Sequence, residues 1–126
     1  MLYIQSNEHY VTLYTTNESK IIHDSLVKIL NQLCLQYGST LDGRISFFKY
    51  WIKVHQKVPI VVSINHGLIL MPLYSIHQKE CILLNYTMIK KYRSINDCQS
   101  EVTFYDQTSI TIDVNIRIIR KQMNRV

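Results

Sequence analysis

The sequence IVVSINHGLILM (residues 60–71) places two apolar runs on either side of Asn65-His66-Gly67. Asn, His and Gly are the residues that most readily adopt a positive φ, and they are frequent in the short turns that join paired strands. We expect Gly67 to take that conformation. The stretch therefore predicts a β-hairpin, and with it a sheet that is mostly antiparallel.

Other segments on both sides of this hairpin are also typical of strands. Residues 2–4 and 10–14 are rich in Tyr, Val, Thr and Ile around a polar cluster, which predicts two strands joined by a turn. Residues 45–54 form the longest β-rich run, and residues 81–88 form another. Residues 101–106 and 110–114 alternate in polarity around Gln107-Thr108-Ser109, which predicts a second hairpin.

Helical spacing occurs near both ends of the chain. Residues 19–33 carry an apolar stripe with a helical period, for which Asn17 or Ser19 is the predicted N-cap. Ile116, Ile119 and Met123 fit one helical face, although the same segment could extend the preceding strand. The predicted fold class is α+β: a mostly antiparallel β-sheet domain with one N-terminal amphipathic helix and a possible short C-terminal helix.

The composition is that of one globular domain spanning residues 1–126. Apolar residues make up 47% and charged residues 18%, with three Gly and two Pro, which excludes disordered, collagen-like and linker-rich chains. The chain has no leader-like segment and no apolar run of membrane-spanning length, so we expect a cytoplasmic protein with no membrane partner. Cys34, Cys81 and Cys98 are odd in number and widely spaced, so we expect reduced thiols.

Positive charge is concentrated in two blocks of the chain. Residues 44–93 hold eight basic residues and one acid, and residues 115–126 hold four basic residues and no acid. Residues 1–43 and 94–114 carry more acid than base. Blocks of one sign point to a polyanionic partner such as nucleic acid, although a basic, well-solvated surface is an equal alternative.

The predicted strand at residues 45–57 sharpens this hypothesis, because side chains on a strand alternate between its two faces. Its even positions give an apolar face. Its odd positions give Lys49, Trp51, Lys53, His55 and Lys57. From Lys49 to Lys57 an extended strand spans about 26 Å, the length of about eight base pairs. An edge strand that uses lysines against aggregation is the alternative interpretation.

Two further basic features complete the predicted nucleic-acid interface. Lys90, Lys91 and Arg93 form a second cluster, interrupted by Tyr92. Arg44 follows Gly43, where a flexible backbone could bring its guanidinium to a phosphate or into a narrow A·T minor groove.

The sequence gives little support for catalysis. Its five histidines are dispersed, and it contains no phosphate-binding loop, dinucleotide-binding glycine pattern, zinc-protease motif or serine-hydrolase motif. We therefore expect no enzyme activity, no cofactor and no metal.

Four short motifs, in order and at compatible spacing, resemble the ComK family of competence transcription factors over residues 34–114. They are CLQYGSTLDGR (34–44), KVPI (57–60), LMPL (70–73) and EVTF (101–104). The resemblance implies a bacterial activator of DNA-uptake genes that binds A/T-rich boxes, largely through the minor groove. It also implies self-association on DNA and an adaptor that delivers the factor to a Clp protease.

Members of that family are longer, with a C-terminal extension that contributes to activation and degradation. We therefore expect this chain to retain DNA binding better than transcriptional activation. Arg44 is the one motif-matched residue whose chemistry suits DNA. The complete set of predicted DNA-binding residues is Arg44, Lys49, Trp51, Lys53, Lys57, Lys90, Lys91 and Arg93.

Two alternatives remain open from the sequence. One is a truncated protein-interaction module that modulates a full-length relative without strong DNA binding. The other is a single-stranded nucleic-acid binder in which Trp51 and nearby tyrosines stack against bases.

Overall fold

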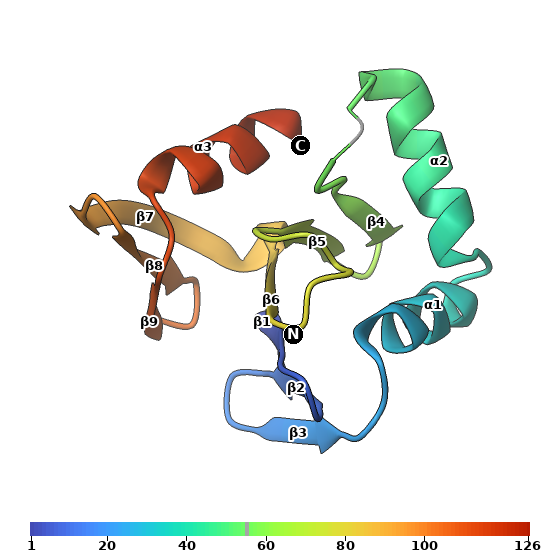
Figure 1. Cartoon of the computed structure of the whole chain (residues 1–126), viewed down its shortest axis with the longest axis horizontal. Coiled ribbons are helices and arrows are strands. Elements are labelled where there is room, and N and C mark those ends of the chain that lie inside the picture. Colours follow the sequence, from blue (N-terminus) through green and yellow to red (C-terminus); the bar gives the residue numbers. More distant parts are fainter. Residues whose placement is uncertain (55) are drawn as a thin grey trace.

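The computed structural model describes residues 1–54 and 56–126, which form nine β-strands and three α-helices (Figure 1). The strands are β1 Tyr3–Ser6, β2 Val11–Tyr14, β3 Ser19–Ile22, β4 Ile60–Ser63, β5 Leu68–Pro72, β6 Cys81–Asn85, β7 Ile89–Asn96, β8 Gln99–Phe104 and β9 Ser109–Ile112. The helices are α1 Leu26–Gln36, α2 Leu41–Ile52 and α3 Ile116–Arg125, with a short 3-10 helix, η1, at Tyr86–Met88. The predicted α+β class is confirmed.

The strands form two antiparallel sheets. The larger has six strands in the order β3-β2-β1-β6-β5-β4, and the smaller has the order β7-β8-β9. Helices α1 and α2 contact β4 of the larger sheet, whereas α3 contacts both β5 and β7. In Figure 1 the smaller sheet and α2 therefore lie at opposite sides of the molecule, with α3 running between β7 and the larger sheet.

Two apolar cores lie on the two faces of the larger sheet. Leu83 of β6 and Leu70 of β5 pack into the first core with α1. The next residues along those strands, Leu84 and Met71, pack into the second core with α3 and the smaller sheet. Because successive side chains point to opposite faces, both faces of β5 and β6 are buried. This explains why their sequences are continuous apolar runs.

The hairpin predicted at residues 60–71 is confirmed as β4 and β5. Gly67 has a φ of +65°, as expected. Its carbonyl oxygen accepts hydrogen bonds from the Asn85 side-chain NH2 group and from the Thr87 hydroxyl, both at 2.8 Å. The turn is thus tied to the end of β6 and to η1.

Replacing Gly67 by valine should lower the free energy of unfolding by about 1–3 kcal/mol. A side chain at this φ is strained, and its Cβ would lie 3.3 Å from the Thr87 hydroxyl oxygen. Urea denaturation measures the change. An unaltered midpoint would mean that the turn has a different backbone conformation.

The prediction of a strand at residues 45–54 is wrong, because residues 45–52 belong to helix α2. The Thr40 hydroxyl caps the helix by accepting from the Gly43 amide at 3.0 Å, and the Asn31 side chain accepts from the Leu41 amide at 2.9 Å. Leu41, Ile45 and Phe48 are spaced for one helical face, which packs toward α1 and β4. Burial of that face outweighs the strand propensity of the segment.

The N-terminal helix begins later than predicted. Residues 19–22 are β3, which pairs with β2. The cap is Ser25 rather than Asn17 or Ser19, with its hydroxyl 3.2 Å from the Lys28 amide. Backbone N–H and C=O groups of residues 19–22 are paired with β2, so these residues do not join the helix. The helix begins only at Leu26, although the helical spacing of apolar residues starts at Ile22.

Cys34 and Cys81 are buried, Cys98 is exposed, and all three are free thiols, as predicted. Burial raises the pKa of the Cys81 thiol to about 11. Burial also raises the pKa of Cys34. Since the thiolate is the reactive form, only Cys98 should react with a thiol reagent in the native protein at pH 8. Mass spectrometry after labelling tests this, and native labelling of Cys81 would contradict it.

Candidate nucleic-acid interface

The predicted basic cluster at residues 90–93 lies on β7, an edge strand of the smaller sheet. Lys91 is opposite Thr103 of β8, Tyr92 is opposite Val102, and Arg93 is opposite Glu101. Tyr92 and Val102 turn inward to the second core. Lys91 and Arg93 occupy the opposite, exposed face, and Lys90 is also exposed. The strand alternation explains why an aromatic residue interrupts the cluster.

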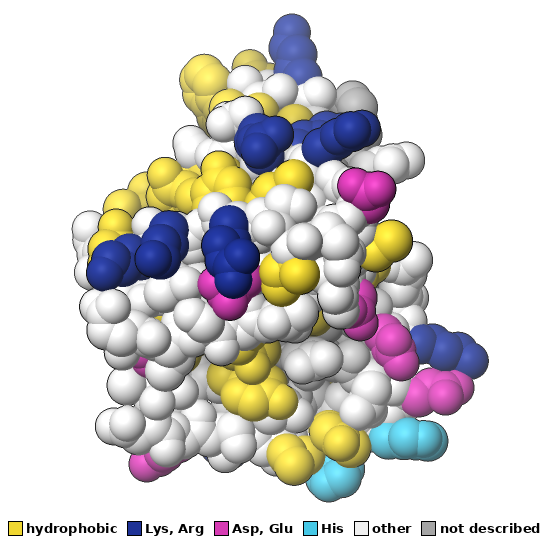
Figure 2. Space-filling model, turned by 90° about the vertical axis from the view of Figure 1, so that its left-hand side faces the viewer, with side chains coloured by type: hydrophobic (Ala, Val, Ile, Leu, Met, Phe, Trp, Pro, Cys, Tyr) yellow, Lys and Arg dark blue, Asp and Glu magenta, His cyan; other side chains and the backbone are white. Residues whose placement is uncertain are grey.

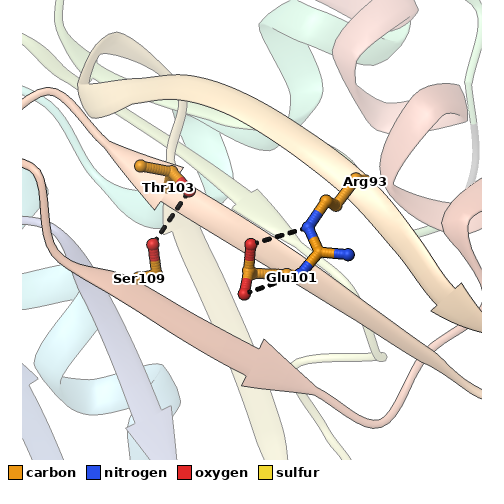
Figure 3. A network of polar contacts seen from close by, with 4 residues as sticks. All are labelled: Arg93, Glu101, Thr103 and Ser109. Carbon is orange, nitrogen blue, oxygen red and sulfur yellow. Dashed lines mark hydrogen bonds and ion pairs between the residues drawn. The ribbon is translucent and has the colours of Figure 1, made fainter.

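One charge on this face is already paired. The Arg93 guanidinium donates to both carboxylate oxygens of Glu101, at 2.9 and 3.3 Å (Figure 3). Beside this pair, the hydroxyl groups of Thr103 and Ser109 lie 2.9 Å apart and link β8 to β9. Because the pair is solvent-exposed, it contributes little to stability, and a polyanion can compete for the guanidinium.

If this face binds duplex DNA, replacing Glu101 by glutamine should strengthen that binding by about threefold to tenfold at 0.1 M salt. The change frees Arg93 for one additional phosphate, and each such contact is worth about 0.9 of log–log salt slope. Fluorescence anisotropy of a labelled duplex measures the effect. Weaker binding by the variant would contradict this expectation.

Helix α3 adds a second group of cations. The Asn115 side chain caps it by accepting from the Arg117 amide at 2.9 Å. Ile119 and Gln122 on one side of this helix are buried. Ile116 and Met123 pack against the second core. Arg117, Arg120 and Lys121 are exposed on the other side, at spacings of three and four residues that place them together. The predicted C-terminal helix is thus confirmed, with its basic residues off the apolar face.

The cations of β7 and α3 gather on the same side of the molecule. Figure 2 shows Lys and Arg side chains over β7 and α3, with apolar side chains between the two groups and most of the acids below. We call the six exposed cations Lys90, Lys91, Arg93, Arg117, Arg120 and Lys121 the β7–α3 surface. Within residues 1–54 and 56–126, Arg93 is the one member whose side chain pairs with a carboxylate.

The strand face predicted to carry Lys49, Trp51, Lys53 and Lys57 does not exist. Lys49 and Trp51 lie in helix α2, which ends at Ile52, and Lys57 lies beyond the helix. His55 falls outside the described residues. Lys53 is exposed and ends the helix in the left-handed conformation, with φ 57°. Lys49 and Lys57 are partly buried. The prediction that these two lysines line an open DNA-binding face therefore loses its structural basis.

The exposed part of α2 is an aromatic stripe. Phe47, Tyr50 and Trp51 are 62%, 74% and 65% exposed. The ring centroid of Trp51 lies 5.3 Å from that of Tyr50 and 6.3 Å from that of Phe47. These residues are spaced as i, i+3 and i+4, so they form one face of the helix. We call them the α2 aromatic stripe.

Arg44 lies in the first turn of α2 and not on a flexible glycine loop. Its Nε atom is buried and has no hydrogen-bond partner within the described parts of the chain. Its positive charge opposes part of the rise that burial causes in the pKa of Cys34 on α1. Arg44 therefore lies in a helix beside α1, so the flexible glycine turn predicted around it is wrong, whereas its contact with DNA stays a prediction.

The residues predicted from the sequence to bind DNA do not include the three exposed cations of α3. A signal was present, since residues 115–126 hold four basic residues and no acid, and these fall mostly off the predicted apolar face. Their position beside β7 depends on how α3 packs across the second core, which no local pattern encodes.

The described residues contain no cluster that could hold a metal ion. None of the described helices combines the length and apolar character needed to cross a membrane.

Among the described residues, a sheet edge and a helix thus present exposed cations on one side of an α+β fold. The family model described as ComK protein matches residues 1–126, so the chain belongs to the ComK family. This confirms the resemblance noted in the sequence.

The chain is also similar to the competence transcription factor of Bacillus subtilis (strain 168). The two are 22% identical over 99 residues, which is 79% of this chain and 52% of that protein. The chain thus spans about half the length of this curated relative. The relative is named as a transcription factor and not as an enzyme. No solved structure matches the chain.

Proposed function

We propose that the chain is a DNA-binding regulator of competence genes that acts in the cytoplasm and holds A/T-rich duplex DNA on the β7–α3 surface. The observation that carries this proposal is that five exposed cations, which have no carboxylate partner within the described residues, lie on one side of the molecule although they come from two elements that are distant in sequence (Figure 2). Membership of the ComK family and the similarity to a competence transcription factor support the same function.

On this surface, lysines and arginines have different roles. Lys90, Lys91 and Lys121 are point charges that suit phosphates. Arg117 and Arg120 are exposed on α3 without a carboxylate partner in the described chain, and arginine is the residue that a narrow A·T minor groove attracts. These two arginines take the groove-reading role that the sequence had assigned to Arg44.

The proposal includes two protein partners implied by the family resemblance: a second copy on DNA, and an adaptor of a Clp protease. The α2 aromatic stripe supports the first, because exposed aromatic side chains on consecutive turns are typical of an interaction surface. Helix α2, which carries the stripe, lies on the side of the molecule away from β7 (Figure 1), so two copies joined through it would keep both basic surfaces free.

The same stripe favours a second candidate function, binding of single-stranded nucleic acid. Tyr50 and Trp51 are exposed enough to stack against bases, and Lys53 follows them. Trp51 is the only tryptophan in the sequence, so its fluorescence reports on this stripe alone.

Anisotropy titrations with A/T-rich duplex, G·C-rich duplex and single strand, each at 50 and 200 mM salt, test the proposal. We expect the A/T-rich duplex to bind most tightly, with affinity falling steeply as salt rises, and netropsin, which fills the A·T minor groove, to compete. Tighter binding of the single strand, with quenching of Trp51, would favour the second candidate. Failure to bind any of the three at 50 mM salt would refute both and favour the protein-interaction module.

A further inference from the structure

A separate cleft of about 400 Å³ opens beneath α2, on the side opposite the aromatic stripe. Its walls come from α2, from residues 56–58 and from the segment that joins β5 to β6. It is lined by Ile45, Lys49, Gln56, Lys57, Val58, Pro72, Ser75, Ile76 and His77. Its volume is within the range of small-molecule sites, about 300–1,000 Å³.

The lining of the cleft combines apolar and basic side chains. Val58 and Pro72 are buried, and with Ile45 and Ile76 they give the cleft an apolar floor. The nitrogen-bearing side chains of Lys49, Lys57 and His77 lie around it, and the lining residues that the structure describes include no Asp or Glu. An apolar floor with two lysines in its lining fits an anion that carries an apolar body.

The cleft is also held in shape by α3. The side-chain Nε2 of buried Gln122 donates to the carbonyl oxygens of Lys57, at 2.7 Å, and of Pro72. Arg125 donates to the carbonyl oxygens of Gln56 and Lys57 at 3.0 and 3.3 Å. These bonds fix two walls of the cleft relative to each other, so the site is formed before any ligand arrives.

Lys57 itself is strained, with a φ of 50° that non-glycine residues adopt only when their surroundings hold them. Gln122 and Arg125 supply that restraint through the Lys57 carbonyl. Backbone strain that is maintained by the surrounding structure is concentrated at ligand sites.

We propose that this cleft binds a small amphipathic anion, with one carboxylate or phosphate group between Lys49 and Lys57 and an apolar body against Val58 and Ile76. The site is distinct from the β7–α3 surface, whose cations stand exposed on an open face suited to a duplex backbone. It accounts for two lysines that the sequence had grouped as DNA contacts. It does not depend on the proposed function.

Phenyl phosphate is a suitable probe, with inorganic phosphate and phenol as its two halves. Calorimetry and ¹H–¹⁵N spectra of the full chain in 150 mM NaCl should show saturable binding of phenyl phosphate at least tenfold tighter than of either half. The amides of Ile45, Val58, Ile76 and His77 should shift. Phenyl phosphate binding no tighter than inorganic phosphate binding would overturn the proposal.

Two matched double variants separate the cleft from the DNA surface. Lys49→Gln with Lys57→Gln should weaken phenyl phosphate binding at least tenfold and leave duplex affinity within about threefold of the parent. Lys90→Gln with Lys91→Gln should weaken DNA binding and leave phenyl phosphate binding unchanged. If the second variant instead removes phenyl phosphate binding, the anion is held by the β7–α3 surface and the cleft proposal is wrong. The phenyl phosphate titration tests the cleft even if the chain does not bind DNA, because the two proposals are independent.

Discussion

Replacing Lys90, Lys91 and Lys121 together by glutamine is expected to weaken binding to duplex DNA by about 10²–10³-fold at 0.1 M salt. All three ammonium groups are exposed, and no carboxylate in the described chain pairs with them. Each phosphate contact contributes about 0.9 to the slope of log affinity against log salt, so the slope should flatten by about 2.7. Anisotropy titrations at four salt concentrations measure both quantities.

The control is a triple variant with the same change in net charge. Lys20, Lys28 and Lys79 lie on β3, on α1 and in the segment before β6, and the latter two already pair with Asp24 and Glu8. Their replacement by glutamine should change affinity by less than about threefold. Equal losses in the two triple variants would mean that net charge, and not the β7–α3 surface, determines binding.

Replacing Phe104 by alanine should lower the free energy of unfolding by about 3–5 kcal/mol, the range for deleting a buried phenyl ring. Phe104 is fully buried at the end of β8, and its ring stacks on Tyr3 of β1 with centroids 5.8 Å apart. The side chain therefore joins the smaller sheet to the larger one. Urea denaturation followed by circular dichroism measures the loss.

The next residue provides a matched control. Tyr105 is also aromatic but 59% exposed, so Tyr105→Ala should cost less than about 1 kcal/mol. If both variants lost the same stability, the second core would not be organised around Phe104.

Elements whose conformation is determined by residues close to them in sequence were predictable. The turn at Gly67 follows from a glycine between apolar runs, and α3 follows from the spacing of Ile116, Ile119 and Met123. In α2 the sequence satisfies two periods at once. Ile45 and Phe48 fit a helical face with Leu41, whereas alternate residues from Lys49 onward fit a strand face. Packing against α1 decides between them, and that contact is not local.

The candidate site was predictable only in part, for the same reason. Lys90, Lys91 and Arg93 form a cluster in sequence, so composition alone located them. The pairing of Arg93 with Glu101 needs the register of β7 and β8. The approach of α3 to β7 needs Ile119, which is distant in sequence from β7, to pack into the second core.

Titration of the ¹⁵N-labelled chain with an A/T-rich duplex tests the central claim, that β7 and α3 form the DNA-binding surface. We predict that the largest amide shifts fall at residues 90–95 and 117–121, while α1 and the β2–β3 hairpin are unchanged. Largest shifts on α2 or in the larger sheet, or no shifts at 50 mM salt, would contradict the account.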